Sequence, residues 1–162
     1  MNERQALRAQ FQGENSHVGF LQALEGLELA LAGKRVPGAP HTIFQALQHI
    51  LYWQDITLAR LRGGPVESPK SAALGWQAPE APEDRRDWEA TIARFAEGLR
   101  ALEVFAESPQ VDLAANPCAG RDSSVREELL MIQGHNSYHL GQIVLLRQML
   151  GAWPPPKGGS TW

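Results

Sequence analysis

Several features are scarce or missing in this sequence, and each absence excludes a class of protein. Cys118 is the only cysteine, so neither an intrachain disulfide nor a cysteine-based zinc site is possible. No apolar run approaches the roughly 20 residues of a membrane span, and the opening residues MNERQALRAQ are too polar for a signal peptide. The 15 basic residues are scattered over a chain of net charge −3, without the basic stripe typical of nucleic-acid binding. We therefore expect a cytoplasmic protein that binds neither nucleic acid nor a membrane.

The apolar residues recur with helical periodicity, and no segment alternates as a β-strand would. A single domain over residues 1–162 suits this length and composition. A short helix can come first and break near Gly13. The four main helices are predicted at about residues 14–32, 41–62, 84–107 and 124–150. They predict an all-α four-helix bundle, with a long connection of about 20 residues between the second and third helices.

Two local signals mark the end of the chain. Ser124 followed by Glu127 forms a capping-box pattern at the start of the last helix. The segment 152–162 is rich in proline and contains Trp153 and Trp162. Two large aromatic residues flanking three prolines are better explained as anchors than as a recognition peptide. We expect this tail to pack on the bundle.

The stretch HNSYHLGQI, residues 135–143, places two histidines four residues apart in the last helix. At 100° per residue, His135 and His139 lie on the same apolar stripe, with Cβ atoms about 5–6 Å apart. One metal ion can bridge two imidazoles at that separation. A lone histidine on an apolar face is more often a hydrogen-bonded core residue, but burying two without a common partner is costly. Asn136 stands where the HExxH motif of metalloproteases has its glutamate base, so a zinc-protease mechanism is not expected.

A metal site needs a third ligand, and three other histidines are available. His17 lies on the apolar stripe of the first predicted helix, whereas His41 lies at the start of the second, where a capping or loop role is expected. His49 lies on a second apolar stripe of that helix with Trp53, opposite the main stripe. A helix that is apolar on two sides is buried on two sides, for example by its own bundle and by a partner subunit. Periodicity alone does not choose between His17 and His49.

Three segments of the sequence resemble a known protein family. The last 28 residues, HNSYHLGQIVLLRQMLGAWPPPKGGSTW, resemble the C-terminal signature of the DinB/YfiT-like family of metal-binding four-helix bundles. APHTIFQALQHILYWQDI resembles that family's second helix, and ENSHVGFLQALEGL resembles the first helix of one branch; residues 63–122 match only loosely. The resemblance implies a divalent metal, commonly zinc or nickel, held by His49, His135 and His139, and it favours His49 over His17. It also implies a homodimer.

The resemblance and the chemistry of the ligands together predict a function. Three neutral histidines leave the full metal charge and an open coordination position, a catalytic pattern, and such a metal can acidify a bound water or thiol. Similar proteins include transferases that use low-molecular-weight thiols, a thiol-dependent isomerase and metal-dependent hydrolases. We predict a metal-dependent enzyme, with an S-transferase acting on electrophilic small molecules ahead of a hydrolase. A non-catalytic metal-binding stress-response protein is the alternative. Cys118 lies in a predicted loop and is expected to take no part.

Further residues lie close to the histidines in the sequence. Gln142 shares the ligand face and can either orient a bound molecule or be satisfied within the bundle. Glu128 is about two helical turns from His135, so we expect a solvated or ion-paired residue rather than a ligand. Trp53, Tyr138 and Asp55 are expected mainly to pack or to cap.

Overall fold

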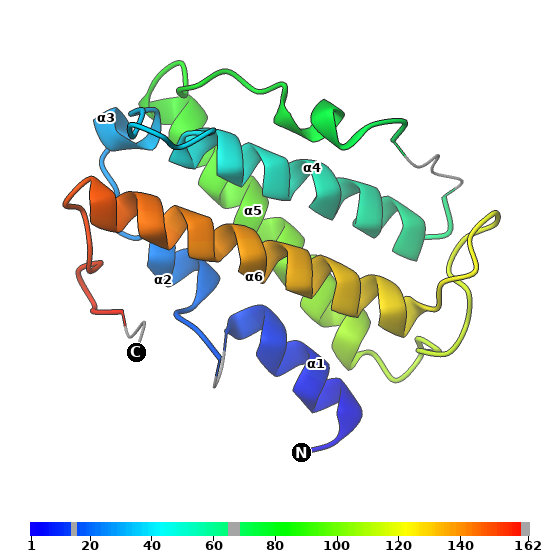
Figure 1. The fold of residues 1–162 in the computed structure, drawn as a ribbon. Coiled ribbons are helices and arrows are strands. Elements are labelled where there is room, and N and C mark those ends of the chain that lie inside the picture. The colour runs from blue at the N-terminus through cyan, green and yellow to red at the C-terminus, as the bar shows by residue number, and fades with distance from the viewer. Residues whose placement is uncertain (14–15, 65–68, 160–162) are drawn as a thin grey trace.

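The computed structural model describes residues 1–13, 16–64 and 69–159, and all of its regular elements are helical. This confirms the predicted all-α fold, and no described helix is long and apolar enough to cross a membrane. The main helices of the described part are α1, α4, α5 and α6, arranged as in Figure 1. The elements are α1 (Glu3–Gln12), α2 (Phe20–Leu24), α3 (Leu29–Ala32), α4 (Ile43–Leu61), the 3₁₀ helix η1 (Ala72–Trp76), α5 (Arg85–Glu107) and α6 (Val125–Met149).

The predicted first helix at residues 14–32 is wrong. The first main helix is α1, and the later segment forms only the short helices α2 and α3. Gly13, at a φ of 75°, ends α1, and Gly26, at a φ of 68°, lies between the two short helices. Both glycines adopt the left-handed conformation that ends a helix. Phe20, Leu24 and Leu27 are nevertheless buried, whereas Leu21 is exposed.

Helices α4 and α6 begin at capping boxes that the local sequence supplies. The backbone N–H of Glu127 donates to Ser124 Oγ, and the backbone N–H of Ser124 donates to Glu127 Oε2 at 2.7 Å. Thr42 and Gln45 form the same reciprocal pair at the start of α4. Each box satisfies backbone donors that the first turn leaves without a helical partner. The capping box predicted for the last helix is thus confirmed.

Helix α4 lies at the centre of the fold, packed against α5, α6 and η1. Figure 1 shows η1 in the long connection between α4 and α5, on the side of α4 away from α1. The predicted long connection is therefore present. The main apolar stripe of α4 is buried within this chain, whereas on the second stripe Ala46 and His49 are buried and Trp53 and Ile56 are half-buried.

Residues 152–159 contact α2 and α6. The buried Arg147 side chain on α6 donates through Nε and Nη2 to the carbonyl of Ala152, at 3.0 and 2.8 Å, and lies 5.6 Å from the ring centre of Trp153. Gln22 Nε2, in α2, donates to the carbonyl of Gly158 at 2.6 Å. These bonds hold this part of the tail on the bundle. Trp162, the other expected anchor, lies outside the described residues.

Candidate metal centre

Three histidines from two helices converge in one place. His49 comes from α4, and His135 and His139 come from α6, with one ring nitrogen from each within 4.8 Å of the others. The Nε2 atoms of His49 and His135 are 3.1 Å apart. Two nitrogens bound to one zinc at about 2.0–2.1 Å would be about 3.3 Å apart at the tetrahedral angle. The spacing therefore fits two ligands of one metal ion.

The outward-facing nitrogens of the three rings meet oxygen atoms. His49 Nδ1 donates to the carbonyl of Gly75 at 3.1 Å, and His139 Nδ1 donates to Gln142 Oε1 at 2.7 Å. His135 Nδ1 lies 3.4 Å from Asn136 Oδ1. A hydrogen bond at Nδ1 fixes the tautomer and leaves Nε2 with a lone pair, as in most histidines that bind metals. The sequence did not predict that Gln142 is the partner of His139.

Burial keeps the imidazoles neutral. It is the main cause that lowers the pKa of His49 and of His135, each to about 4, and the nearby His139 lowers both further. Burial also lowers the pKa of His139 itself. All three rings are consequently uncharged at pH 7, the state that a metal ligand requires.

Trp76 of η1 covers one side of the cluster. Its ring centre lies 3.8 Å from that of His49 and 3.7 Å from that of His41, and both pairs are within 9° of parallel. Two rings at these distances cannot share one face without overlapping, so Trp76 lies between His41 and His49. Trp53 makes edge contacts with His49 and His135. The sequence did not predict Trp76, because the stretch around it has no helical periodicity.

His17 lies apart from the cluster. Its Nε2 is 2.9 Å from Ser137 Oγ, and its Nδ1 is 2.8 Å from the carbonyl of Val18. Both ring nitrogens are thus occupied by ordinary hydrogen bonds. The structure brings His49 rather than His17 to His135 and His139, and metal binding by these three remains a prediction.

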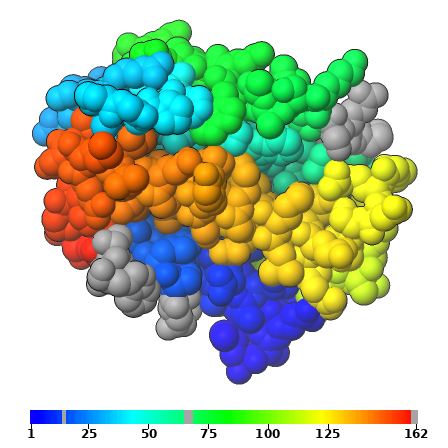
Figure 2. All heavy atoms as spheres, viewed as in Figure 1, coloured from blue at the N-terminus to red at the C-terminus, as the bar shows by residue number. Residues whose placement is uncertain are grey.

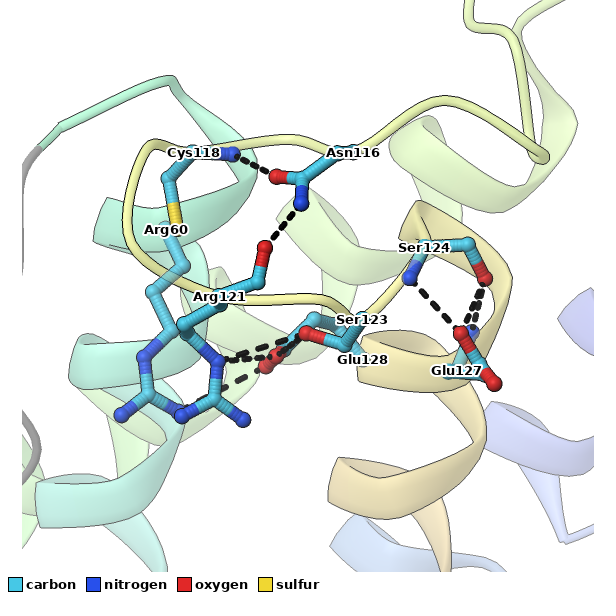
Figure 3. A network of polar contacts seen from close by, with 8 residues as sticks. All are labelled: Arg60, Asn116, Cys118, Arg121, Ser123, Ser124, Glu127 and Glu128. Carbon is cyan, nitrogen blue, oxygen red and sulfur yellow. Dashed lines mark hydrogen bonds and ion pairs between the residues drawn. The ribbon is translucent and has the colours of Figure 1, made fainter.

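The carboxylates predicted near the histidines have other partners. Glu128 is fully buried, with its carboxylate 2.8 Å from Arg121 Nε and 3.5 Å from Arg60 Nη1. Figure 3 shows Arg60 from α4 and Arg121 from the loop before α6 approaching this carboxylate together. Glu128 is therefore ion-paired and not solvated. Asp55 pairs with Arg94 on α5, and Tyr138 is exposed with its ring edge against His139.

Comparison with known protein families gives a match over most of the chain. The family model described as the DinB superfamily matches residues 12–143, a segment that contains all three clustered histidines. No curated protein and no solved structure matches the chain.

Proposed function

Because the chain belongs to the DinB superfamily, we propose that it is a divalent-metal-dependent enzyme whose metal binds to His49, His135 and His139. The observation that carries the proposal is the convergence of three neutral imidazoles, with His49 and His139 buried, His135 half-buried and two Nε2 atoms 3.1 Å apart. Without a metal, one of these two Nε2 atoms would have to carry a proton and donate it to the other ring, whereas two Nε2 lone pairs can bind one metal ion together. Imidazole ligands suit zinc and nickel.

The three ligands and the residues around them would set the charge of the metal, the orientation of the rings and the access of water. Three uncharged ligands would leave the metal its full charge and an open position, so that it could acidify a thiol or a water molecule at neutral pH. The Gly75 carbonyl and Gln142 hold the His49 and His139 rings in orientation. Trp53 and Trp76 cover the rings with apolar surface and limit the access of water.

The surroundings favour a thiol-dependent S-transferase over a hydrolase. Hydrolysis by a metal site commonly uses a carboxylate as general base. Among the described residues, the ring and hydrogen-bond partners of the three histidines include no carboxylate, and Glu128 is held by two arginines. A thiol needs less assistance, because its pKa is already closer to neutral than that of water. We therefore propose a low-molecular-weight thiol and an electrophilic small molecule as substrates, and we retain the homodimer as a prediction.

Metal analysis of protein purified without a histidine tag tests the site. We expect about one divalent ion per chain, lost in His135→Ala and kept in His17→Ala, which also removes an imidazole. Full occupancy of the His135→Ala protein would refute the proposed ligand set.

A pair of assays tests the reaction. With 1-chloro-2,4-dinitrobenzene, a thiol forms the new carbon–sulfur bond as chloride leaves. We expect the enzyme to raise this rate only when a thiol is present, and a chelator to abolish the increase. Chelator-sensitive cleavage of 4-nitrophenyl acetate without any thiol would indicate a hydrolase. Full metal occupancy with neither activity would favour a non-catalytic metal-binding protein.

A further inference from the structure

A cavity of about 380 Å³ opens between the loop before α4 and the second half of α6. This volume lies within the range of small-molecule sites. Figure 2 shows α6 in orange directly against this loop in cyan. Most of its lining is apolar and comes from residues 37–40, Ala46, Leu145, Leu146 and Met149.

Only two described side chains in the lining are polar, and both connect the cavity with the histidine cluster. Gln142 lines the cavity and also accepts the hydrogen bond from His139 Nδ1. His41 lines it and stacks on the face of Trp76 opposite His49. The polar end of the cavity is therefore one side chain away from His49, through Trp76, and in contact with His139 through Gln142, although none of the three clustered histidines lines it.

We propose that this cavity binds the hydrocarbon part of an uncharged small molecule, with its polar group near His41 and Gln142. The proposal rests on the proposed function, because it makes this molecule the substrate presented to the metal. None of the described lining side chains is charged, so a buried carboxylate or phosphate would lose its hydration without gaining an ionic partner. An apolar body gains from burial instead. The class of substrate is therefore an uncharged, mostly hydrocarbon electrophile.

A series of alkyl probes measures this burial. Straight-chain hydroxamic acids from acetohydroxamic to octanohydroxamic acid are uncharged at pH 7 and carry one metal-binding group. We expect their affinity for the zinc-loaded protein, measured by calorimetry, to rise about fourfold for each methylene that the cavity buries. An affinity that does not change with chain length would overturn the proposal.

Two matched variants locate the effect. Leu145 and Leu130 are both on α6 and are 55% and 48% exposed, but only Leu145 lines the cavity. Leu145→Glu should remove the dependence on chain length and leave acetohydroxamic acid binding unchanged. Leu130→Glu should leave both unchanged. Equal effects of the two variants would overturn the assignment.

Hexan-1-ol added to metal-free protein separates the cavity from the metal site. If zinc fails to bind, the proposed function fails, but shifts in the methyl NMR signals of Leu145, Leu146 and Met149 would still support the cavity as a hydrocarbon site. The absence of such shifts would overturn the inference. A dimer that Leu145→Glu dissociates in sedimentation, with no alcohol-induced shifts, would assign the cavity to a subunit interface and also overturn it.

Discussion

Substitution of Gly75 tests how His49, the third proposed ligand, is held in position. This buried residue of η1 accepts the hydrogen bond from His49 Nδ1. In Gly75→Ala the new Cβ would lie 2.7 Å from His49 Nδ1 and 3.1 Å from Tyr52 Cδ1. Its φ is outside the left-handed region, so steric contact rather than backbone strain decides the outcome.

The size of the displacement sets the expected effect. Ordinary contacts of a Cβ begin near 3.4 Å, so the imidazole or η1 must move by about 0.7 Å. Metal–ligand distances tolerate only about 0.2 Å. We expect Gly75→Ala to weaken zinc binding by about 10–100-fold, the range seen when groups that orient a ligand are changed.

Competition against a chromophoric chelator at pH 7 measures this affinity, and thermal unfolding shows whether the variant still folds. Gly134→Ala is the matched control, because it adds the same methyl group beside His135, where a Cβ would meet nothing within 4 Å. It should bind zinc as the wild type does. A Gly75→Ala protein with wild-type zinc affinity would refute the positioning of His49 by η1.

Three further predictions concern zinc affinity and the stability of the fold. His49→Ala should lower zinc affinity by orders of magnitude in the same competition assay, whereas His17→Ala should change it by no more than about 10–100-fold; the reverse order would exchange their roles. For the metal-free protein, the free energy of unfolding in urea should fall between pH 7 and pH 5. The unfolded chain takes up protons near pH 6.5, whereas His49 and His135 keep a pKa of about 4 when folded. The loss at pH 5 should be about 2 kcal/mol for the buried His49 and less for the half-buried His135, and equal stability at both pH values would contradict it. Glu128→Gln should lower the free energy of chemical unfolding by at least about 1 kcal/mol, because the buried amide no longer attracts the charges of Arg60 and Arg121, and unchanged stability would contradict this.

The parts of the fold that could be predicted from sequence depend on neighbouring residues. The i, i+4 spacing of His135 and His139 places them on one face whatever surrounds the helix. The box of Ser124 and Glu127 likewise marks where α6 begins. The wrong prediction of one helix over residues 14–32 also came from neighbouring residues. The apolar periodicity there was given more weight than Gly26, which is a helix-ending signal. Burial of that segment required the apolar spacing but not a continuous helix.

The parts that could not be predicted depend on contacts between distant segments. Periodicity shows on which side of its own helix His49 lies, but not which helix faces that side. The choice of His49 rather than His17 as the third ligand therefore came from a family resemblance. Trp76 is 27 positions after His49 and lies in a connection without periodicity. Only the packing of η1 on α4 brings it onto the ring. The cavity beside Gln142 was missed for the same reason, since its walls come from a loop and two helices.

The contacts of η1 connect the two proposed sites physically. Its Gly75 carbonyl fixes the tautomer of His49, and its Trp76 ring covers both His49 and the cavity-lining His41. Under the proposed function, a metal on His49 Nε2 restrains the ring against which η1 packs. The coupling between two equilibria is reciprocal. If an ordered η1 strengthens metal binding, then metal binding stabilises the ordered η1 by the same free energy. The same ordering fixes His41 at the polar end of the cavity. Metal binding should therefore also organise the cavity wall, so that hexan-1-ol binds more tightly to the zinc-loaded protein than to the metal-free protein.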